Sequence, residues 1–400
     1  MGVEAGRDEM DAGRPSADPD TEFASEGLCY LPRRQGRHRT LPSPHRMRLA
    51  HLTLPHLNRP TTMADDGIQQ YYGETLTHQR DLKTGACCSP EAMPTYLRPW
   101  LQAIPREVTD RFYGCGSPLP AAATGAAVVD LGCGTGRDAF LASRLVGPTG
   151  RVVGIDMTPR QLQVAERALP EHRAASGLDN VDFRLGSIED LATAGIADAS
   201  VDVVISNCVL NLAADKGRVL AEVFRALKPG GELYFSDVFA DRRIPAALLA
   251  DPVLRGECLS GALYLEDFRR LLQGLGCADA RIVARSAIPL LDEDVEAKIG
   301  HICFESITVR AFKLDLEDRC EDYGQVATYR GTIPHHPHAF ALDDHHRFET
   351  GRPMLVCGNT ADMLAKTRYA PHFAVSERGA HFGLFDCAPT TAVASPAACC

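Results

Sequence analysis

Hydrophobic and polar positions repeat in a regular order between residues 128 and 286. Short apolar runs predict buried strands at 128–132, 151–156, 181–185, 201–206, 232–238 and 280–286. Stretches with a period near 3.6 residues predict helices at 137–146, 159–175, 215–228 and 264–275. Strands that alternate with helices predict an α/β fold with a doubly wound parallel sheet. In such sheets ligands bind at the carboxyl ends of the strands.

The flanks of this region follow other patterns. Residues 68–78 and 93–104 are helix-like, and the glycine-flanked loop 112–116 leads into the first strand, so we expect this segment to act as a lid. Beyond residue 289 the alternation fades, which predicts a small C-terminal α+β domain over 289–387. In that domain we expect a strand near 302–313 and a helix near 361–366.

The two ends lack a periodic apolar pattern. Residues 1–62 are rich in Pro, Arg, Gly, Ser and His, which predicts a disordered extension without a function of its own. Residues 388–400 end in Cys399 and Cys400 and are expected to form a flexible tail. The core domain is therefore predicted to span 63–288.

A glycine-rich turn follows the first strand and has the form G-x-G-x-G, with Gly132, Gly134 and Gly136. Arg137 stands where a dinucleotide-binding turn has its third glycine, so a pyrophosphate ligand is not favoured. Asp130, directly before the turn, would repel a pyrophosphate but suits an ammonium group. Asp156 ends the second strand, which is the place of a carboxylate that hydrogen-bonds ribose hydroxyls. These features indicate a nucleoside cofactor with an amino-acid part.

Composition narrows the function classes. The chain has 400 residues, a net charge of −10 and 14 cysteines. The acidic balance argues against a nucleic-acid partner, and no apolar stretch is long enough for a membrane span. Without a visible secretory signal we expect a cytoplasmic protein whose cysteines are thiols rather than a disulfide scaffold. A monomer is the default expectation.

At the glycine-rich turn the chain resembles the S-adenosylmethionine-dependent methyltransferases, whose glycine motif has the same G-x-G-x-G form. Cysteines stand in several loops where such an enzyme would otherwise offer a general base. Cys208 follows the fourth strand, Cys258 lies in a glycine-flanked loop after the fifth, and Cys115 lies in the lid. Cys87, with Cys88 beside it, lies further upstream. Three soft thiolates suit a thiophilic centre such as trivalent arsenic, which keeps a lone pair that can attack a methyl sulfonium without a base.

At these residues the chain resembles the arsenite S-adenosylmethionine methyltransferases. The matching stretches are Tyr71–Gly73, Ala86-Cys87, Tyr113–Gly116, Ser206–Cys208, Gly230–Val238 and Gly256–Tyr264. The resemblance covers roughly residues 67 to 320, and more weakly to about 387. It implies a Rossmann-like class I methyltransferase sheet and the methylation of arsenite to methyl- and dimethylarsenicals in arsenic detoxification.

The resemblance also implies residue roles. Cys115, Cys208 and Cys258 would bind As(III), and Cys87 would be a catalytic relay thiol that can pair with Cys115 in a disulfide. A thiol reductant, glutathione or thioredoxin, would then regenerate the enzyme. S-adenosylmethionine would be held by Tyr113, Asp130, Gly132, Gly134, Asp156, Met157, Ile188, Glu189 and Asn207.

Two other functions remain open from the residues alone. A methyltransferase for a small organic acceptor, such as a quinone or sterol, would need an apolar pocket and no cysteines. A zinc- or metalloid-binding protein with an inactive core would favour C-x-x-C pairs, and none occurs here.

Several other conspicuous residues are expected to be structural. We expect Cys133, Cys277 and Cys303 to be core residues, Asp237 to be a structural acid, and the histidines between 335 and 346 to lie in a surface loop.

Overall fold

The computed structural model describes residues 93–387. The predictions for residues 1–62, for the helix 68–78, for Cys87 and for the tail 388–400 lie outside the described residues. The start of the predicted core domain also lies there.

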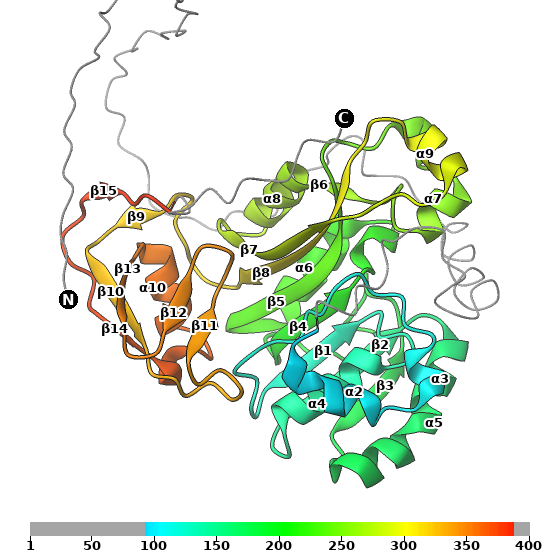
Figure 1. The fold of residues 1–400 in the computed structure, drawn as a ribbon, viewed down its shortest axis with the longest axis horizontal. Helices are drawn as coiled ribbons and strands as arrows, with labels where there is room; N and C mark the ends of the chain where they lie inside the picture. Colours follow the sequence, from blue (N-terminus) through cyan, green and yellow to red (C-terminus); the bar gives the residue numbers. More distant parts are fainter. Residues whose placement is uncertain (1–92, 388–400) are drawn as a thin grey trace, which may run out of the picture. The chain divides into compact units, whose positions relative to one another are not determined.

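One large sheet forms the centre of the fold, in the strand order β3-β2-β1-β4-β5-β8-β7 (Figure 1). Its parallel strands are β1 (Ala127–Leu131), β2 (Arg151–Asp156), β3 (Val181–Leu185), β4 (Val201–Asn207) and β5 (Leu227–Ala240). The strand β8 (Phe304–Phe312) is antiparallel to both β5 and β7 (Ala280–Ala287), and the two-residue β6 (Leu263–Tyr264) pairs with the end of β5. The predicted α/β sheet is confirmed.

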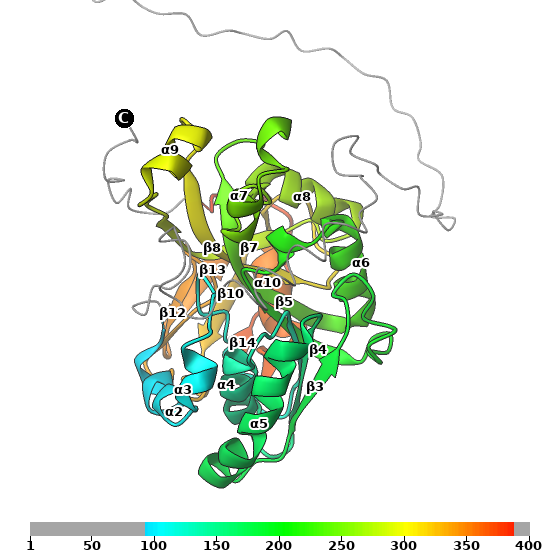
Figure 2. The same ribbon diagram turned by 90° about the vertical axis from the view of Figure 1, so that its right-hand side faces the viewer.

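Helices cover both faces of this sheet because alternate strand residues point to opposite sides. Val128 and Val203 pack in one core with α4 (Arg137–Val146) and α5 (Pro159–Ser176). Their neighbours Val129 and Val204 pack in a second core with α6 (Lys216–Ala226) and α8 (Leu265–Gly274). Figures 1 and 2 together show this layering. The apolar runs at these strands are therefore buried on both faces, as parallel sheets require.

Short elements complete the core domain and its lid. They are η4 (Thr95–Leu97), α2 (Arg98–Gln102), α3 (Arg106–Thr109), η5 (Leu210–Leu212), η6 (Ala246–Leu248), α7 (Pro252–Gly256) and α9 (Glu293–Ile299). The predicted helix 93–104 is thus divided into a 3-10 turn and one short helix. Pro94 and Pro99 lie at its start, where prolines are tolerated because they lack only an otherwise unpaired N–H.

The strand predicted at 302–313 lies in the central sheet rather than in the small C-terminal domain. Every residue of β8 pairs with β5, from Phe304 opposite Ala240 to Phe312 opposite Glu232. The pattern of β8 is almost continuously buried, which an inserted central strand requires. Periodicity cannot show which sheet a strand joins, because pairing partners are set by tertiary contacts.

The small C-terminal domain follows β8 and is built mainly from short antiparallel strands. It contains β9 (Glu321–Asp322), β10 (Gln325–Tyr329), β11 (Ala339–Ala341), β12 (Arg347–Glu349), β13 (Pro353–Val356), α10 (Gly358–Ala365), η7 (Ala370–His372), β14 (Phe373–Val375) and β15 (Gly383–Leu384). Its own apolar core is largely aromatic and includes Tyr329, Phe340 and Phe348.

A buried ion cluster joins this domain to the central sheet. Glu232 on β5 is fully buried and lies 3.1 Å from the Nε of Arg310 on β8, which is itself 2% exposed. Arg368 of the C-terminal domain pairs with the other oxygen of the same carboxylate. The buried Arg310 and the partly buried Arg368 thus surround the buried Glu232 carboxylate and compensate a charge that would otherwise be costly inside a protein.

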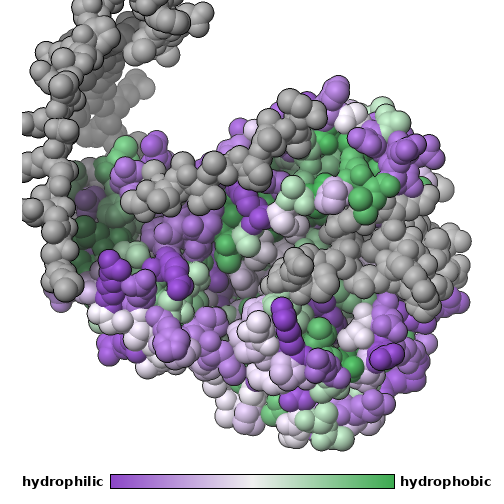
Figure 3. Space-filling view, in the orientation of Figure 1, coloured by the Kyte–Doolittle hydropathy of each residue, from purple (hydrophilic) through white to green (hydrophobic). Residues whose placement is uncertain are grey.

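Among the described helices, none is long and apolar enough to cross a membrane. Hydrophilic and hydrophobic residues are interspersed over the part of the surface that Figure 3 colours. Most of the large apolar side chains of the described residues lie in buried cores, and six of them, including Leu185 and Phe382, are 43–73% exposed.

Candidate active site

A cavity opens at the carboxyl ends of β1, β2 and β4, where the strand order reverses. This is the place at which doubly wound sheets bind their ligands. All nine residues assigned to the cofactor from the sequence line it: Tyr113, Asp130, Gly132, Gly134, Asp156, Met157, Ile188, Glu189 and Asn207. The structure therefore brings together residues that are up to 94 positions apart.

Asp156, at the end of β2, fixes the glycine turn by a hydrogen bond. One oxygen of the Asp156 carboxylate accepts from the Gly134 N–H at 2.9 Å, and the other accepts from the Thr158 N–H at 2.8 Å. Gly132 and Gly134 have φ values of 61° and 53°, in the left-handed region that favours glycine. A side chain on Gly132 would also collide with Val209. Both the backbone conformation and the close packing therefore require glycine at this position.

Asp130 is a buried carboxylate at the floor of this cavity. It is 3% exposed, and its Oδ2 accepts no hydrogen bond from the described residues. Burial, followed by the nearby carboxylates of Asp138 and Asp156, raises the pKa of Asp130 well above its usual value. A cationic group in the cavity would stabilise the ionised Asp130 carboxylate, because it would supply an opposite charge and a hydrogen-bond donor for the carboxylate oxygen. The site thus fits the ammonium of S-adenosylmethionine.

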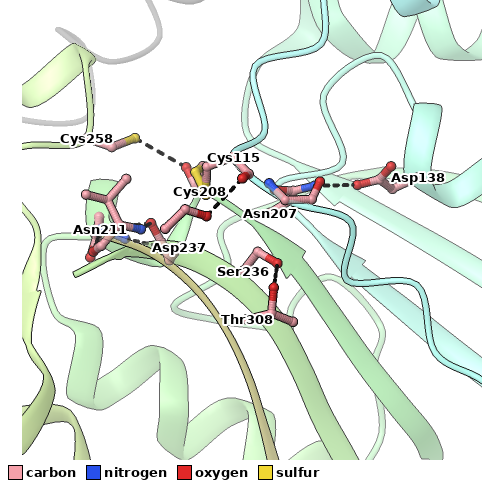
Figure 4. Close-up of a disulfide and its surroundings, with 12 residues drawn as sticks. Cys115, Asp138, Asn207, Cys208, Asn211, Ser236, Asp237, Cys258 and Thr308 are labelled. Carbon is pink, nitrogen blue, oxygen red and sulfur yellow. Dashed lines mark hydrogen bonds between the residues drawn. A yellow bond between two sulfur atoms is a disulfide. The ribbon is translucent and has the colours of Figure 1, made fainter. Parts of the chain in front are cut away.

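The lid loop is fastened over the cavity by Asn207, at the end of β4. The Asn207 side chain accepts from the Gly116 N–H at 3.1 Å and donates to the Gly116 carbonyl at 2.9 Å. It also donates to the Asp138 carboxylate at 2.8 Å (Figure 4). A side chain at Gly114 would collide with Asn207, so the loop can lie this close only because that residue is glycine.

Three of the singled-out cysteines converge beside the cavity from three different loops (Figure 4). Cys115 of the lid and Cys208 after β4 form a disulfide, with their Cα atoms 5.9 Å apart. Cys258, after α7, directs its sulfur to the Cys208 carbonyl at 3.5 Å. The three residues share one apolar cluster and are 4%, 4% and 1% exposed in chain order. A ligand held by their sulfurs would therefore be shielded from water.

The backbone holds two of these cysteines in an unfavourable conformation. Cys208 and Cys258 have φ values of 59° and 62°, although residues other than glycine rarely adopt the left-handed region. Such a conformation costs on the order of 1–3 kcal/mol and persists only where the surrounding structure enforces it. Strain of this kind clusters at functional sites. Here it occurs at Cys208 and Cys258, which belong to the same apolar cluster and are joined by the contact from the Cys258 sulfur to the Cys208 carbonyl.

Asp237 stabilises the loop that carries Cys208. Its carboxylate accepts from the Asn211 side chain at 2.8 Å and from the Asn211 N–H at 3.2 Å. Burial raises the pKa of Asp237 to about 7. These bonds within the protein agree with the structural role expected for this acid.

The structure also places the remaining sequence candidates. Cys133 and Cys277 are buried, and Cys303 is half-buried. His335 stacks on Tyr96 with ring centroids 4.4 Å apart, and His346 lies against the Asp343 carboxylate at 2.8 Å. His335 is exposed, but His346 is buried at 5% exposure, so the prediction of a surface loop is wrong for His346.

The disulfide differs from the pairing that the resemblance implied. The resemblance implies that Cys87 can pair with Cys115, and in this structure Cys115 is bonded to Cys208. Cys87 itself lies outside the described residues. A spacing of 93 residues gives no indication of such a pair, because only the tertiary fold brings the lid onto the end of β4.

Sequence reasoning also missed residues that position the site. Ser306 of β8 donates to the Cys115 carbonyl at 2.9 Å and so fixes the lid cysteine from the far side. Thr158, Gln161 and Ser187 also line the cavity. No motif marks Ser306, since it lies 191 residues from its partner.

Comparisons with known proteins place this geometry in context. Residues 123–276 match the family profile described as a methyltransferase domain, and residues 322–395 match the profile of the arsenite methyltransferase C-terminal domain. An arsenite methyltransferase of Aquipseudomonas alcaligenes is 52% identical over 323 residues, which cover 80% of this chain and 93% of that protein. The arsenite methyltransferase of Mus musculus is 42% identical over 309 residues, which cover 76% and 82%.

A solved structure is similar over the same region. The arsenic(III) S-adenosylmethionine methyltransferase CrArsM from Chlamydomonas reinhardtii is 50% identical, with a TM-score of 0.71. The match covers 74% of this chain and 100% of that one.

Proposed function

Because the chain belongs to the arsenite methyltransferase family, we propose that its three converging cysteines bind As(III) beside the cofactor cavity. The protein transfers methyl groups from S-adenosylmethionine to trivalent arsenic. The observation that carries the site assignment is the convergence of Cys115, Cys208 and Cys258 in one water-shielded apolar cluster, with Cys208 also lining the cavity.

The chemistry follows from the donor set. Bound in the cavity, S-adenosylmethionine supplies an electrophilic methyl group on a sulfonium. Arsenic held by three thiolates keeps a lone pair, which forms the As–C bond while the C–S bond breaks and leaves its electron pair on sulfur. No proton has to be removed from the acceptor, so a thiol-lined site without a general base is sufficient. Exclusion of water by the lid protects the transfer.

The protein residues divide the remaining work. Asp130 holds the ammonium of the cofactor, and Asp156 with the glycine turn holds its ribose region. Met157, Ile188 and Glu189 border the part of the cavity that takes the adenine, and Tyr113 closes over it from the lid. Asn207 fastens the lid and so keeps Cys115 beside Cys208.

Thiol oxidation returns the methylated arsenic to the trivalent state. Methyl transfer raises arsenic formally from +3 to +5. Two thiolates that leave as a disulfide give two electrons back to arsenic, and an external thiol such as glutathione or thioredoxin then reduces the disulfide. The Cys115–Cys208 bond supports such a cycle, since it shows that two of the proposed ligands lie close enough to be oxidised together. Cys87 serves as the relay thiol in this proposal.

The protein is proposed to act as a monomer in the cytoplasm. Seven of the nine cysteines in the described part are thiols, which suits a reducing compartment.

The test is methyl transfer from labelled S-adenosylmethionine to arsenite by the full chain, with glutathione present. Cys208→Ser and Cys258→Ser are each expected to abolish transfer to arsenite and to methylarsenite. Cys115→Ser should block the first methylation but spare the second, because methylarsenite has only two positions left for thiolates. Cys303→Ser is the matched control, since it removes a thiol outside the site.

Two results would contradict the proposal. Arsenite turnover by Cys208→Ser would refute the three-thiolate mechanism. If the wild type bound S-adenosylmethionine but transferred no methyl group to arsenite, the acceptor would instead be an organic molecule.

A further inference from the structure

A second group of cysteines lies in the C-terminal domain, and none of its members lines the cofactor cavity. The sulfurs of Cys320, Cys357 and Cys387 all lie within 4.8 Å of one another. Three sulfurs bound to one centre at about 2.3 Å, with tetrahedral or smaller angles between them, are about 3.8 Å apart or less, so side-chain movements of about 1 Å would let all three reach one centre.

The fold brings these thiols together from distant parts of the chain. Cys320 precedes β9, Cys357 follows β13, and Cys387 follows β15. The pairing of β9 with β15 continues in a backbone hydrogen bond from Phe385 to the Cys320 carbonyl at 2.8 Å. This bond draws the segment that carries Cys387 alongside Cys320.

The surroundings of Cys357 favour a thiolate. Cys357 is fully buried and caps the N-terminus of α10, where its sulfur accepts from the Thr360 N–H at 3.4 Å. The Arg281 guanidinium donates to the same sulfur at 3.7 Å. Arg281 is fixed in turn by salt bridges of 2.7 Å to Asp279 and 3.0 Å to Asp343. A buried sulfur with a backbone donor and a guanidinium beside it is an environment built for negative charge.

We propose that Cys320, Cys357 and Cys387 form a second site for trivalent arsenic, separate from the methyl-transfer site. The choice of arsenic rests on the proposed function, since that function makes As(III) the soft ion this protein meets. None of these three thiols lines the cofactor cavity, so this site binds arsenite without methylating it.

The number of ligands favours arsenic over zinc. Structural zinc takes four protein ligands in a tetrahedron. Within the described residues no histidine or carboxylate joins the three sulfurs in this group. Three thiolates complete the coordination shell of trivalent arsenic, because its lone pair occupies the fourth coordination position. Arsenous acid, two thiols, the Cys357 thiolate and one proton from solvent give one neutral tris-thiolate and three waters, so the bound arsenic adds no charge beside the buried Asp343 carboxylate.

The test measures arsenite binding by the full chain carrying Cys208→Ser and Cys258→Ser, which removes two ligands of the methyl-transfer site. The protein is reduced with a phosphine, dialysed against arsenite and analysed for bound arsenic. We expect one tightly bound As(III) per chain, with three sulfur neighbours by X-ray absorption. Adding Cys387→Ser should weaken binding at least about tenfold, because even the loss of an outer-shell partner costs a metal site 10- to 100-fold.

Two further variants control for folding and for thiol count. Cys357→Ser keeps an acceptor at the N-cap of α10, so loss of arsenic from this variant with an unchanged circular dichroism spectrum reports on the sulfur alone. Cys303→Ser, added to the same background, should leave binding unchanged.

Three outcomes would overturn the proposal. They are the absence of bound arsenic, equal affinity after Cys387→Ser, and binding of zinc that arsenite cannot displace. The wild-type methylation assay separates the two hypotheses. If the wild type methylates arsenite but the background variant binds none, only the second site is refuted. If arsenic binds in a Cys387-dependent way but no methylation occurs, only the methyl-transfer function is refuted.

Discussion

Replacing Asp130 by asparagine should change stability and cofactor binding in opposite directions. Asp130 is buried at the floor of the cavity, with an oxygen that accepts no hydrogen bond from the described residues. Burial, together with the carboxylates of Asp138 and Asp156, raises its pKa. Asparagine has nearly the same shape and removes only the charge, so it isolates the electrostatic contribution of this side chain.

The stability change follows from proton linkage. A carboxyl whose pKa is raised in the folded state binds more protons there than in the unfolded chain, so its ionisation destabilises the fold as the pH rises above about 4. Each pH unit by which the pKa is raised corresponds to about 1.4 kcal/mol at neutral pH. The asparagine side chain is also a buried polar group, but a neutral amide costs less free energy to bury than an ionised carboxylate. We therefore expect Asp130→Asn to raise the free energy of unfolding at pH 7 by on the order of 1 kcal/mol, which raises the Tm by about 2–4 °C.

The binding change has the opposite sign. A hydrogen bond to a charged group contributes about 1.5–3 kcal/mol, and 1.4 kcal/mol corresponds to a tenfold change in affinity. Loss of the carboxylate should therefore weaken S-adenosylmethionine binding by about 10- to 150-fold. Calorimetric titration measures this Kd, and scanning calorimetry without ligand measures the Tm.

The control is Asp182→Asn, which removes a carboxylate that is 58% exposed on β3 and should leave both quantities nearly unchanged. The stability gain of Asp130→Asn should vanish below about pH 4, where the wild-type carboxyl is protonated in both states. A lower Tm at pH 7 together with an unchanged Kd would refute the reasoning, because Asp130 would then be a structural hydrogen-bonding residue rather than the cofactor's counter-ion.

Three other perturbations test further parts of the structure. Oxidised protein that retains the Cys115–Cys208 disulfide should bind less arsenite than the same protein after phosphine reduction, measured by dialysis, and equal binding would exclude these two sulfurs as ligands. Glu232→Gln should lower the free energy of unfolding in urea by about 3–5 kcal/mol, because the buried Arg310 loses its anion. A decrease in the free energy of unfolding of less than about 1 kcal/mol would contradict the proposal that Glu232 compensates the charge of the buried Arg310. Burial lowers the pKa of His172 to about 4, so the folded state binds fewer protons than the unfolded chain between about pH 4 and 6.5, and stability falls as the pH drops through this range. His172→Gln should reduce the change in the free energy of unfolding between about pH 4 and 6.5, measured by urea unfolding. An unchanged pH dependence would show that other groups cause the loss of stability.

The periodicity of the chain was sufficient to predict the central fold. The β1–α4–β2–α5 order follows from apolar runs of strand length and amphipathic stretches of helix length, because the two periods differ and buried parallel strands are apolar throughout. The strand-end acids Asp130 and Asp156 could be placed on one cavity for a related reason. Parallel strands present their carboxyl ends at the same edge of a sheet, so residues far apart in the chain share that edge.

The tertiary structure alone decided which residues meet across long loops. The strand β8 enters the central sheet, Ser306 reaches the lid cysteine, and Cys115 bonds to Cys208. The same holds for the cluster of Cys320, Cys357 and Cys387, whose members showed no metal-ligand spacing. A local pattern reflects only interactions between near neighbours, whereas these contacts depend on how the lid and the C-terminal strands pack. The sequence by itself thus determined the parallel strands of the sheet and the cofactor edge, whereas the packing of distant segments determined where β8 lies and which thiols lie together.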